Sequence, residues 1–177
     1  MIPVEYFWFA LIFMLGIIGA VRGLAKELGV TTIVALSLFV LKFVWNQFLP
    51  TITKLAEGAP FGLSLEMDRA VVFAVAILFV AVISYEGIVL QFPFKDLKGL
   101  GRGFFGFLGG LLNGYMIIGT IWDVVAHAGY FAPKVSVVSQ SLTSLHQTIV
   151  QLLPVTFINQ YILLALGMVL LLAIVLK

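Results

Sequence analysis

The sequence contains no cysteine and very little charge. Only 10% of its 177 residues are Asp, Glu, Lys or Arg, and the formal net charge is +2. Without cysteine the chain has no disulfide framework, no thiolate metal site and no thiol nucleophile. A net charge this small, with no clustered basic stripe, argues against nucleic-acid binding. We therefore expect no nucleic-acid partner.

The usual patterns of catalysis and metal binding are also missing. His127 and His146 stand nineteen residues apart with no ligand spacing around them, which argues against a metal site. There is no G-x-S-x-G elbow, no H-E-x-x-H and no phosphate loop. The glycine-rich run at 99–103 does not follow a strand of a βαβ unit, so a dinucleotide site is not indicated. We expect no enzymatic activity, no cofactor and no metal.

Apolar residues dominate instead. Hydrophobic residues make up 62% of the chain and the mean hydropathy is +1.18, whereas a soluble domain is roughly 45–50% apolar and 25% charged. A soluble domain of this length still exposes about a third of its unfolded surface, so it could not hide so many apolar side chains. The surplus is expected to face the lipid bilayer.

Five hydrophobic runs are long enough to cross a membrane, which takes about 20 apolar residues. None alternates with a period of two, so helices are expected rather than barrel strands. The sequence predicts an all-α, polytopic transmembrane bundle with a four-helix domain at 1–125, an external loop at 126–154 and a C-terminal helix at 155–177. The runs are Tyr6–Val21, Leu28–Phe48 (stopping before Pro50), Ala70–Leu90, Phe104–Val125 and Val155–Leu176.

The loop between the last two runs contains a helical pattern. Apolar residues recur there at spacings of three and four, with uncharged polar residues between them, which indicates an amphipathic helix. This helix could lie in the interface on the outer side of the membrane. Alternatively it could form a docking surface for a partner, because a helix without cations gains little from anionic lipid. The apolar positions are Val138, Leu142, Leu145, Ile149 and Leu152.

Loop cations predict the orientation. Six Lys and Arg residues fall on the side of the first and third loops and three on the other, and such cations gather in the cytoplasm. We expect an N-terminus outside and a C-terminus in the cytoplasm. With no basic region before it, the first run is expected to be a retained span rather than a cleaved signal. The short link Arg22–Glu27 leaves open whether the first two runs are full spans or one bent, re-entrant element.

Two glycine ridges stand in the first and fourth runs. Gly106, Gly110 and Gly114 repeat at intervals of four, and Gly19 and Gly23 repeat the same spacing. Ridges of small residues let helix backbones approach closely in a membrane. They predict either packing within the chain or an interface with a second copy or another subunit.

Two stretches resemble the colicin V production protein family. Gly19-Ala-Val-Arg22-Gly23-Leu-Ala-Lys26-Glu27 is similar to its G-x-x-R-G-x-x-[KR]-E signature. Residues 100–114 resemble its second glycine block, except that Asn113 stands where a basic residue is usual. The resemblance covers roughly residues 5 to 125. It implies a small bacterial inner-membrane protein of about four spans, linked to colicin V production and export and to envelope homeostasis, in a family without an agreed biochemical activity.

Four polar residues fall inside or near the ends of the spans, where such groups are costly and suggest function. Lys42 and Asp123 are expected near the same membrane face, so an ion pair between them is possible. Lys42 could instead snorkel to the surface, with the acids paired structurally. Alternatively, Glu86, Asn113 and Asp123 could line an ion or proton path.

Two functional classes follow from these patterns. The first is a scaffold, assembly factor or accessory subunit of a larger inner-membrane complex, which the glycine ridges and the small soluble portion favour. The second is a small channel or transporter, for which the intramembrane polar residues are the motivation. No pair of runs shows the inverted repeats or matched helix breaks typical of secondary transporters, so the first class is preferred.

Overall fold

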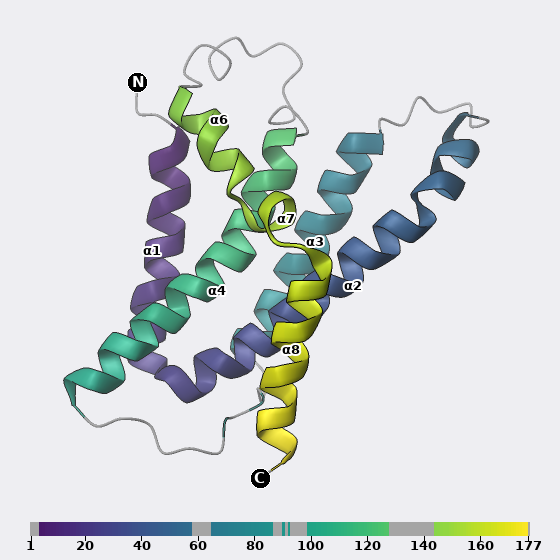
Figure 1. Ribbon diagram of the computed structural model, residues 1–177. Helices are drawn as coiled ribbons and strands as arrows, with labels where there is room; N and C mark the ends of the chain where they lie inside the picture. Colours follow the sequence, from purple (N-terminus) through teal and green to yellow (C-terminus); the bar gives the residue numbers. More distant parts are fainter. Residues whose placement is uncertain are drawn as a thin grey trace.

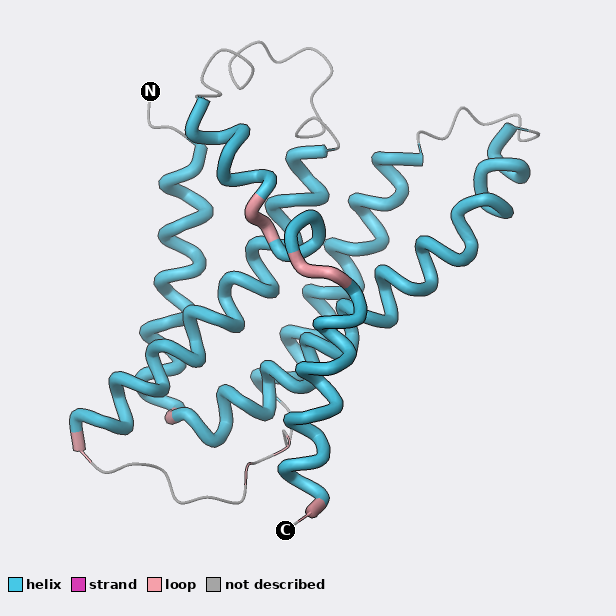
Figure 2. Tube along the Cα trace, viewed as in Figure 1, coloured by secondary structure: helices cyan, strands magenta, loops and turns pink. Residues whose placement is uncertain are grey.

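The computed structural model describes residues 4–57, 65–86, 90, 92, 99–127 and 144–176. Within these residues the chain is helical and has no strand, so the predicted all-α class is confirmed (Figures 1 and 2). The helices are α1 (Val4–Arg22), α2 (Leu24–Glu57), α3 (Leu65–Glu86), α4 (Leu100–His127), α6 (Ser144–Gln151), α7 (Pro154–Phe157) and α8 (Gln160–Val175).

Four of these helices are long and apolar enough to span a membrane. Their outward side chains are largely apolar as well, for example Phe79 of α3, which is 65% exposed. In water such surfaces would be costly, whereas in lipid they are not. The chain is therefore a multi-pass helical membrane protein. The candidate spans are Glu5–Arg22, Leu24–Phe48, Arg69–Glu86 and Leu100–His127.

The link between the first two spans is a single residue. Gly23 separates α1 from α2 and has a φ of 89°, a left-handed conformation that glycine adopts without steric cost. Its N–H donates to the carbonyl of Gly19, and its own carbonyl accepts from the N–H of Glu27. The residues Arg22–Glu27 are thus helix ends. Both helices are full-length, with 19 and 34 residues, rather than parts of a re-entrant element.

Two apolar runs and their helices differ in where they end. The candidate span of α2 ends at Phe48, as predicted, but the helix itself continues past Pro50 to Glu57, because a proline removes only one backbone donor. α3 ends at Glu86, and Leu90 lies outside any helix although the apolar run includes it.

The predicted fifth span is interrupted. Pro154 opens the short helix α7, after which Ile158 and Asn159 are extended. The Asn159 side chain then accepts a hydrogen bond from the N–H of Tyr161 and starts α8, as N-cap residues do. α8 has 16 residues and is about 24 Å long, somewhat less than a typical hydrocarbon core.

α6 coincides with the second half of the predicted amphipathic helix. It covers Ser144–Gln151, whereas Val138 and Leu142, which belong to the same pattern, lie outside the described residues. After α6, Leu152 is half-exposed and Leu153 is buried. The location of α6 in a membrane interface stays a prediction.

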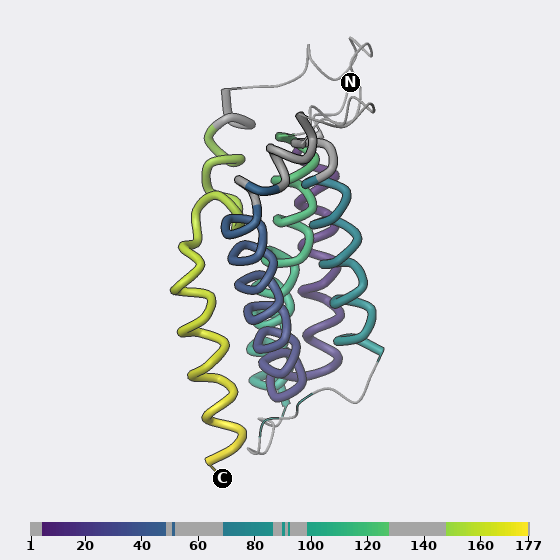
Figure 3. Tube along the Cα trace, turned by 90° about the vertical axis from the view of Figure 1, so that its right-hand side faces the viewer, coloured from purple at the N-terminus to yellow at the C-terminus, as the bar shows by residue number. Residues whose placement is uncertain are grey.

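α4 is the central helix. It packs against α1, α2, α3 and α7, while α8 lies along α2 on the outer flank (Figures 1 and 3). The ends of α1 and α8 nearest the two termini lie at opposite ends of the bundle (Figure 1). The buried core comes from α2, α3, α4 and α8 and comprises Val30, Val34, Ala35, Leu38, Ile77, Met116, Ile117 and Leu163.

Candidate functional site

The two glycine ridges face each other inside the chain. A Cβ added at Gly19 would strike the carbonyl oxygen of Gly106 and lie 2.7 Å from the Cα of Gly110. A Cβ at Gly114 would lie 3.1 Å from the Cα of Ile12. The α1 and α4 backbones are therefore in direct contact, and the structure places both ridges in intramolecular packing.

Aromatic side chains flank this contact. Trp8 of α1 stacks on Trp122 of α4 with ring centroids 5.9 Å apart. Farther along, Phe13 meets Phe107 edge-on at 5.5 Å. Offset and edge-to-face ring pairs add to the packing energy, so the tryptophan pair extends the seam beyond the glycines and the phenylalanine pair packs beside them.

A buried polar cluster joins the four long helices. We call it the Glu27 cluster, and its centre is the fully buried carboxylate of Glu27 on α2. Oε2 of Glu27 accepts from Nδ2 of Asn113 at 2.8 Å and from the hydroxyl of Tyr85 at 3.1 Å. Oε1 lies 3.3 Å from a guanidinium nitrogen of Arg22. The members are Arg22 (α1), Glu27 and Thr31 (α2), Tyr85 (α3) and Asn113 (α4).

Further hydrogen bonds and a ring contact extend the cluster. Asn113 Nδ2 donates to the backbone carbonyl of Glu27 at 3.0 Å, and Asn113 Oδ1 accepts from the Thr31 hydroxyl at 2.8 Å. The Arg22 guanidinium lies 4.4 Å from the centre of the Tyr85 ring, a cation–π distance. A carboxylate buried without such partners would be strongly destabilising. The cluster therefore fixes how these helices sit against one another.

Both stretches with a family resemblance meet here. Arg22 and Glu27 belong to the first stretch, and Asn113, whose amide donates to the carboxylate, belongs to the second. Lys26 is exposed. Gly109 makes room, because a Cβ there would lie 2.8 Å from Cβ of Glu27.

Sequence reasoning missed Thr31, Tyr85 and Gly109. Thr31 stands one helical turn after Glu27, and Tyr85 is a hydroxyl-bearing residue late in an apolar run. These two positions could have suggested that Thr31 and Tyr85 are buried hydrogen-bond partners of Glu27 and Asn113. Which of them faces Asn113 depends on how the helices rotate, which periodicity alone does not determine.

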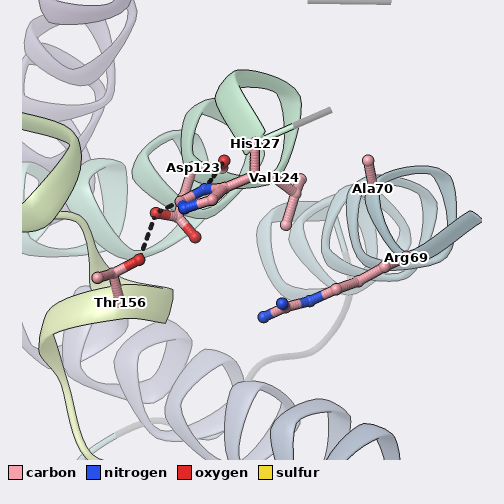
Figure 4. A pocket seen from close by; sticks show the side chains of 6 residues that line it. All are labelled: Arg69, Ala70, Asp123, Val124, His127 and Thr156. Atoms are coloured by element: carbon pink, nitrogen blue, oxygen red, sulfur yellow. Dashed lines mark hydrogen bonds and ion pairs between the residues drawn. The ribbon is translucent and has the colours of Figure 1, made fainter. Parts of the chain in front are cut away.

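A second polar site surrounds Asp123, near the other end of α4. A cavity of about 80 Å³, here called the Asp123 pocket, opens between α3, α4 and α7 (Figure 4). Oδ1 of Asp123 accepts from the Thr156 hydroxyl at 2.8 Å and lies 3.7 Å from Nδ1 of His127. The lining residues are Arg69, Ala70, Asp123, Val124, His127 and Thr156.

Lys42 forms no ion pair with Asp123, so the pairing that the sequence left possible is not present. Its ammonium donates to the carbonyls of Val155 at 2.8 Å and Ile158 at 2.6 Å. The break between α7 and α8 leaves these carbonyls without helical partners. The ammonium therefore binds at the helix end rather than to the carboxylate.

Glu86, Asn113 and Asp123 do not come together. Glu86 is exposed at the end of α3. Asn113 and Asp123 stand ten positions apart on α4, about 15 Å along the axis, and the buried Met116 and Ile117 lie between them. Among the described residues, no group of three His, Cys, Asp or Glu side chains could hold a metal ion.

Fold and clusters together define a polytopic helical membrane protein whose buried polar groups join its helices. No protein-family model, curated protein or solved structure matches the chain. The resemblance to the colicin V production family therefore stays an expectation from the motif residues of the two stretches.

Proposed function

We propose that the protein acts by interaction, as a scaffold, assembly factor or accessory subunit of a larger complex in a bacterial inner membrane. The observation that carries this proposal is the Glu27 cluster, in which polar side chains from α1 to α4 engage one another. Intramembrane polar groups used this way hold helices together. They favour a rigid platform that presents its outer faces.

The separation of the polar residues supports the same conclusion. A transport path needs polar groups that follow one another across the membrane. Here the Glu27 cluster and the Asp123 pocket lie at different depths of α4, with apolar core between them. The glycine ridges are used within the chain, so a partner would meet other faces.

Photo-cross-linking in native membranes tests the proposal. A photoreactive residue is placed at an exposed position on each of three helices: Val21 of α1 (76% exposed), Phe79 of α3 (65%) and Val169 of α8 (64%). The matched control is Ile77, which is buried on the opposite face of the same helix from Phe79. We expect at least one exposed position to give a discrete protein adduct in near-stoichiometric yield, whereas Ile77 gives none. Adducts with lipid alone at all three exposed positions would contradict the proposal.

The bacterial inner membrane and the orientation, N-terminus outside and C-terminus in the cytoplasm, are part of the proposal. The motif stretches support the first, and the six-to-three distribution of loop cations supports the second. The same motifs support a link to toxin production and export.

A channel or transporter is the second candidate, and the Asp123 pocket is the observation that favours it. The pocket brings Arg69, Asp123 and His127 together at one end of the spans. Ion flux into proteoliposomes distinguishes the two functions. Under the interaction proposal, wild-type protein, Glu86→Gln and Asp123→Asn all match empty vesicles. Wild-type flux that Asp123→Asn abolishes would establish the transport function instead.

A further inference from the structure

The Asp123 pocket lies at the ends of two candidate spans. Arg69 is the first residue of the third candidate span and His127 is the last of the fourth. Val71, Val72 and Val75 follow on α3 and are half-exposed or more. The pocket thus combines polar groups at the ends of candidate spans, where lipid headgroups are expected, with an adjacent exposed apolar face.

Two opposite charges face this cavity without touching. The structure gives no ion pair within 4.0 Å between Arg69 and Asp123, although both line the pocket (Figure 4). Nε of Arg69 is buried without a hydrogen-bond partner among the described residues. Oδ1 of Asp123 is engaged by Thr156, whereas Oδ2 turns toward the side of Arg69 (Figure 4) and receives no hydrogen bond from the described chain.

Such a gap fits a ligand that carries both charges. Leaving a buried charged donor such as Nε of Arg69 unpaired is costly, and a group with an anion at one end and a hydrogen-bonding cation at the other would pair with both Arg69 and Asp123. The cavity measures about 80 Å³. This is well above the roughly 10–15 Å³ that a single water needs, so the pocket has room for a small polar group.

We propose that the Asp123 pocket binds a phosphoethanolamine group, with its phosphate on Arg69 and its ammonium on Oδ2 of Asp123. Guanidinium is well suited to phosphate because its donors form a planar fork. The carboxylate selects an ammonium that still has N–H donors. The zwitterionic headgroup of phosphatidylethanolamine in the surrounding bilayer supplies this group.

The wild-type protein alone can test the selectivity. Purified protein is equilibrated with equal amounts of phosphatidylethanolamine, its mono- and dimethyl derivatives, phosphatidylcholine and phosphatidylglycerol, and the retained lipid is identified by native mass spectrometry. We expect retention to fall with each added methyl, to a total of about tenfold, the factor for one charge-assisted hydrogen bond of modest strength. Equal retention of the ethanolamine and choline lipids, or preference for phosphatidylglycerol, would overturn the proposal.

Variants separate the two contacts. Asp123→Asn keeps the Thr156 contact and should bring the ethanolamine-to-choline ratio close to one. Arg69→Gln should reduce retention of both lipids by a similar factor and leave their ratio unchanged. Arg102→Gln, at the opposite end of α4, is the matched control and should change neither. A ratio unaffected by Asp123→Asn in a folded protein would refute the assignment of the ammonium.

A final arm distinguishes the lipid from a soluble source. If free phosphoethanolamine, but not free phosphocholine, displaces retained lipid, the headgroup is the recognised part. If the free compound stabilises the protein against heat while no lipid is enriched, the site takes soluble phosphoethanolamine. Absence of both effects would overturn the proposal, and none of these results depends on whether a protein partner is found.

Discussion

Replacing Gly110 by alanine tests the α1–α4 seam directly. A Cβ at this position would strike the carbonyl oxygen of Leu15 and lie 3.0 Å from the Cα atoms of Gly16 and Gly19. These are backbone atoms of the facing helix, so no side chain can move aside. α1 must shift away from α4 as a whole.

The magnitude follows from two opposing effects. Overpacking of a tight contact costs about 1–3 kcal/mol, whereas Gly→Ala in a helix interior gains up to about 1 kcal/mol from helix propensity. Gly103 is the matched control, because it lies in the same helix and a Cβ there meets nothing within 4 Å. The propensity effect is common to both variants. We therefore expect Gly110→Ala to be about 1–3 kcal/mol less stable than Gly103→Ala.

Unfolding in mixed micelles, with increasing amounts of dodecyl sulfate, measures this difference. The Trp8–Trp122 stack spans the two helices, so tryptophan fluorescence reports their separation. Equal midpoints for the two alanine variants would refute the close backbone packing of α1 on α4.

Three further predictions concern the Glu27 cluster, the helix link and the topology. Asn113→Leu removes two donors from the buried Glu27 and should lower the free energy of unfolding by about 2–3 kcal/mol in the same micelle assay; an unchanged midpoint would contradict the cluster. Gly23→Ala forces a left-handed conformation on a residue with a side chain and should cost about 1–2 kcal/mol, which a thermal melt in detergent would detect as a lower midpoint. Because native cysteine is absent, single cysteines at Arg102 and Gln151 should react with an impermeant maleimide from opposite sides of the membrane, with Arg102 cytoplasmic; same-side labelling would contradict the arrangement of α4.

Hydropathy predicted the helices well because each long apolar run must satisfy its own backbone in lipid. It placed α1 and α4 within a few residues of their ends. It did not foresee that α2 continues as a helix past Pro50, beyond the end of its span, and it failed at Asn159, where a side-chain cap divides the last run in two. Local chemistry decides such ends, and hydropathy does not register it.

The polar contacts were harder to predict because they join distant parts of the chain. The motif analysis singled out Glu27 and Asn113 separately, but their hydrogen bond depends on the rotation of α2 and α4 about their axes. For Lys42 the sequence left two alternatives, an ion pair with Asp123 and snorkelling to the surface. The free carbonyls that bind its ammonium exist only because α7 ends at Phe157, which the apolar pattern does not indicate.

The partnership of α1 with α4 also sets an order of events during synthesis. α1 is joined to α2 by one residue, yet its main contact is with α4. The glycines of α4 that match Gly19 follow roughly 90 residues later, which at about 5–20 residues per second takes on the order of 5–20 s. During that interval the glycine face of α1 is without its partner. Anything that shields it meanwhile, whether lipid or an insertion factor, must leave when α4 arrives.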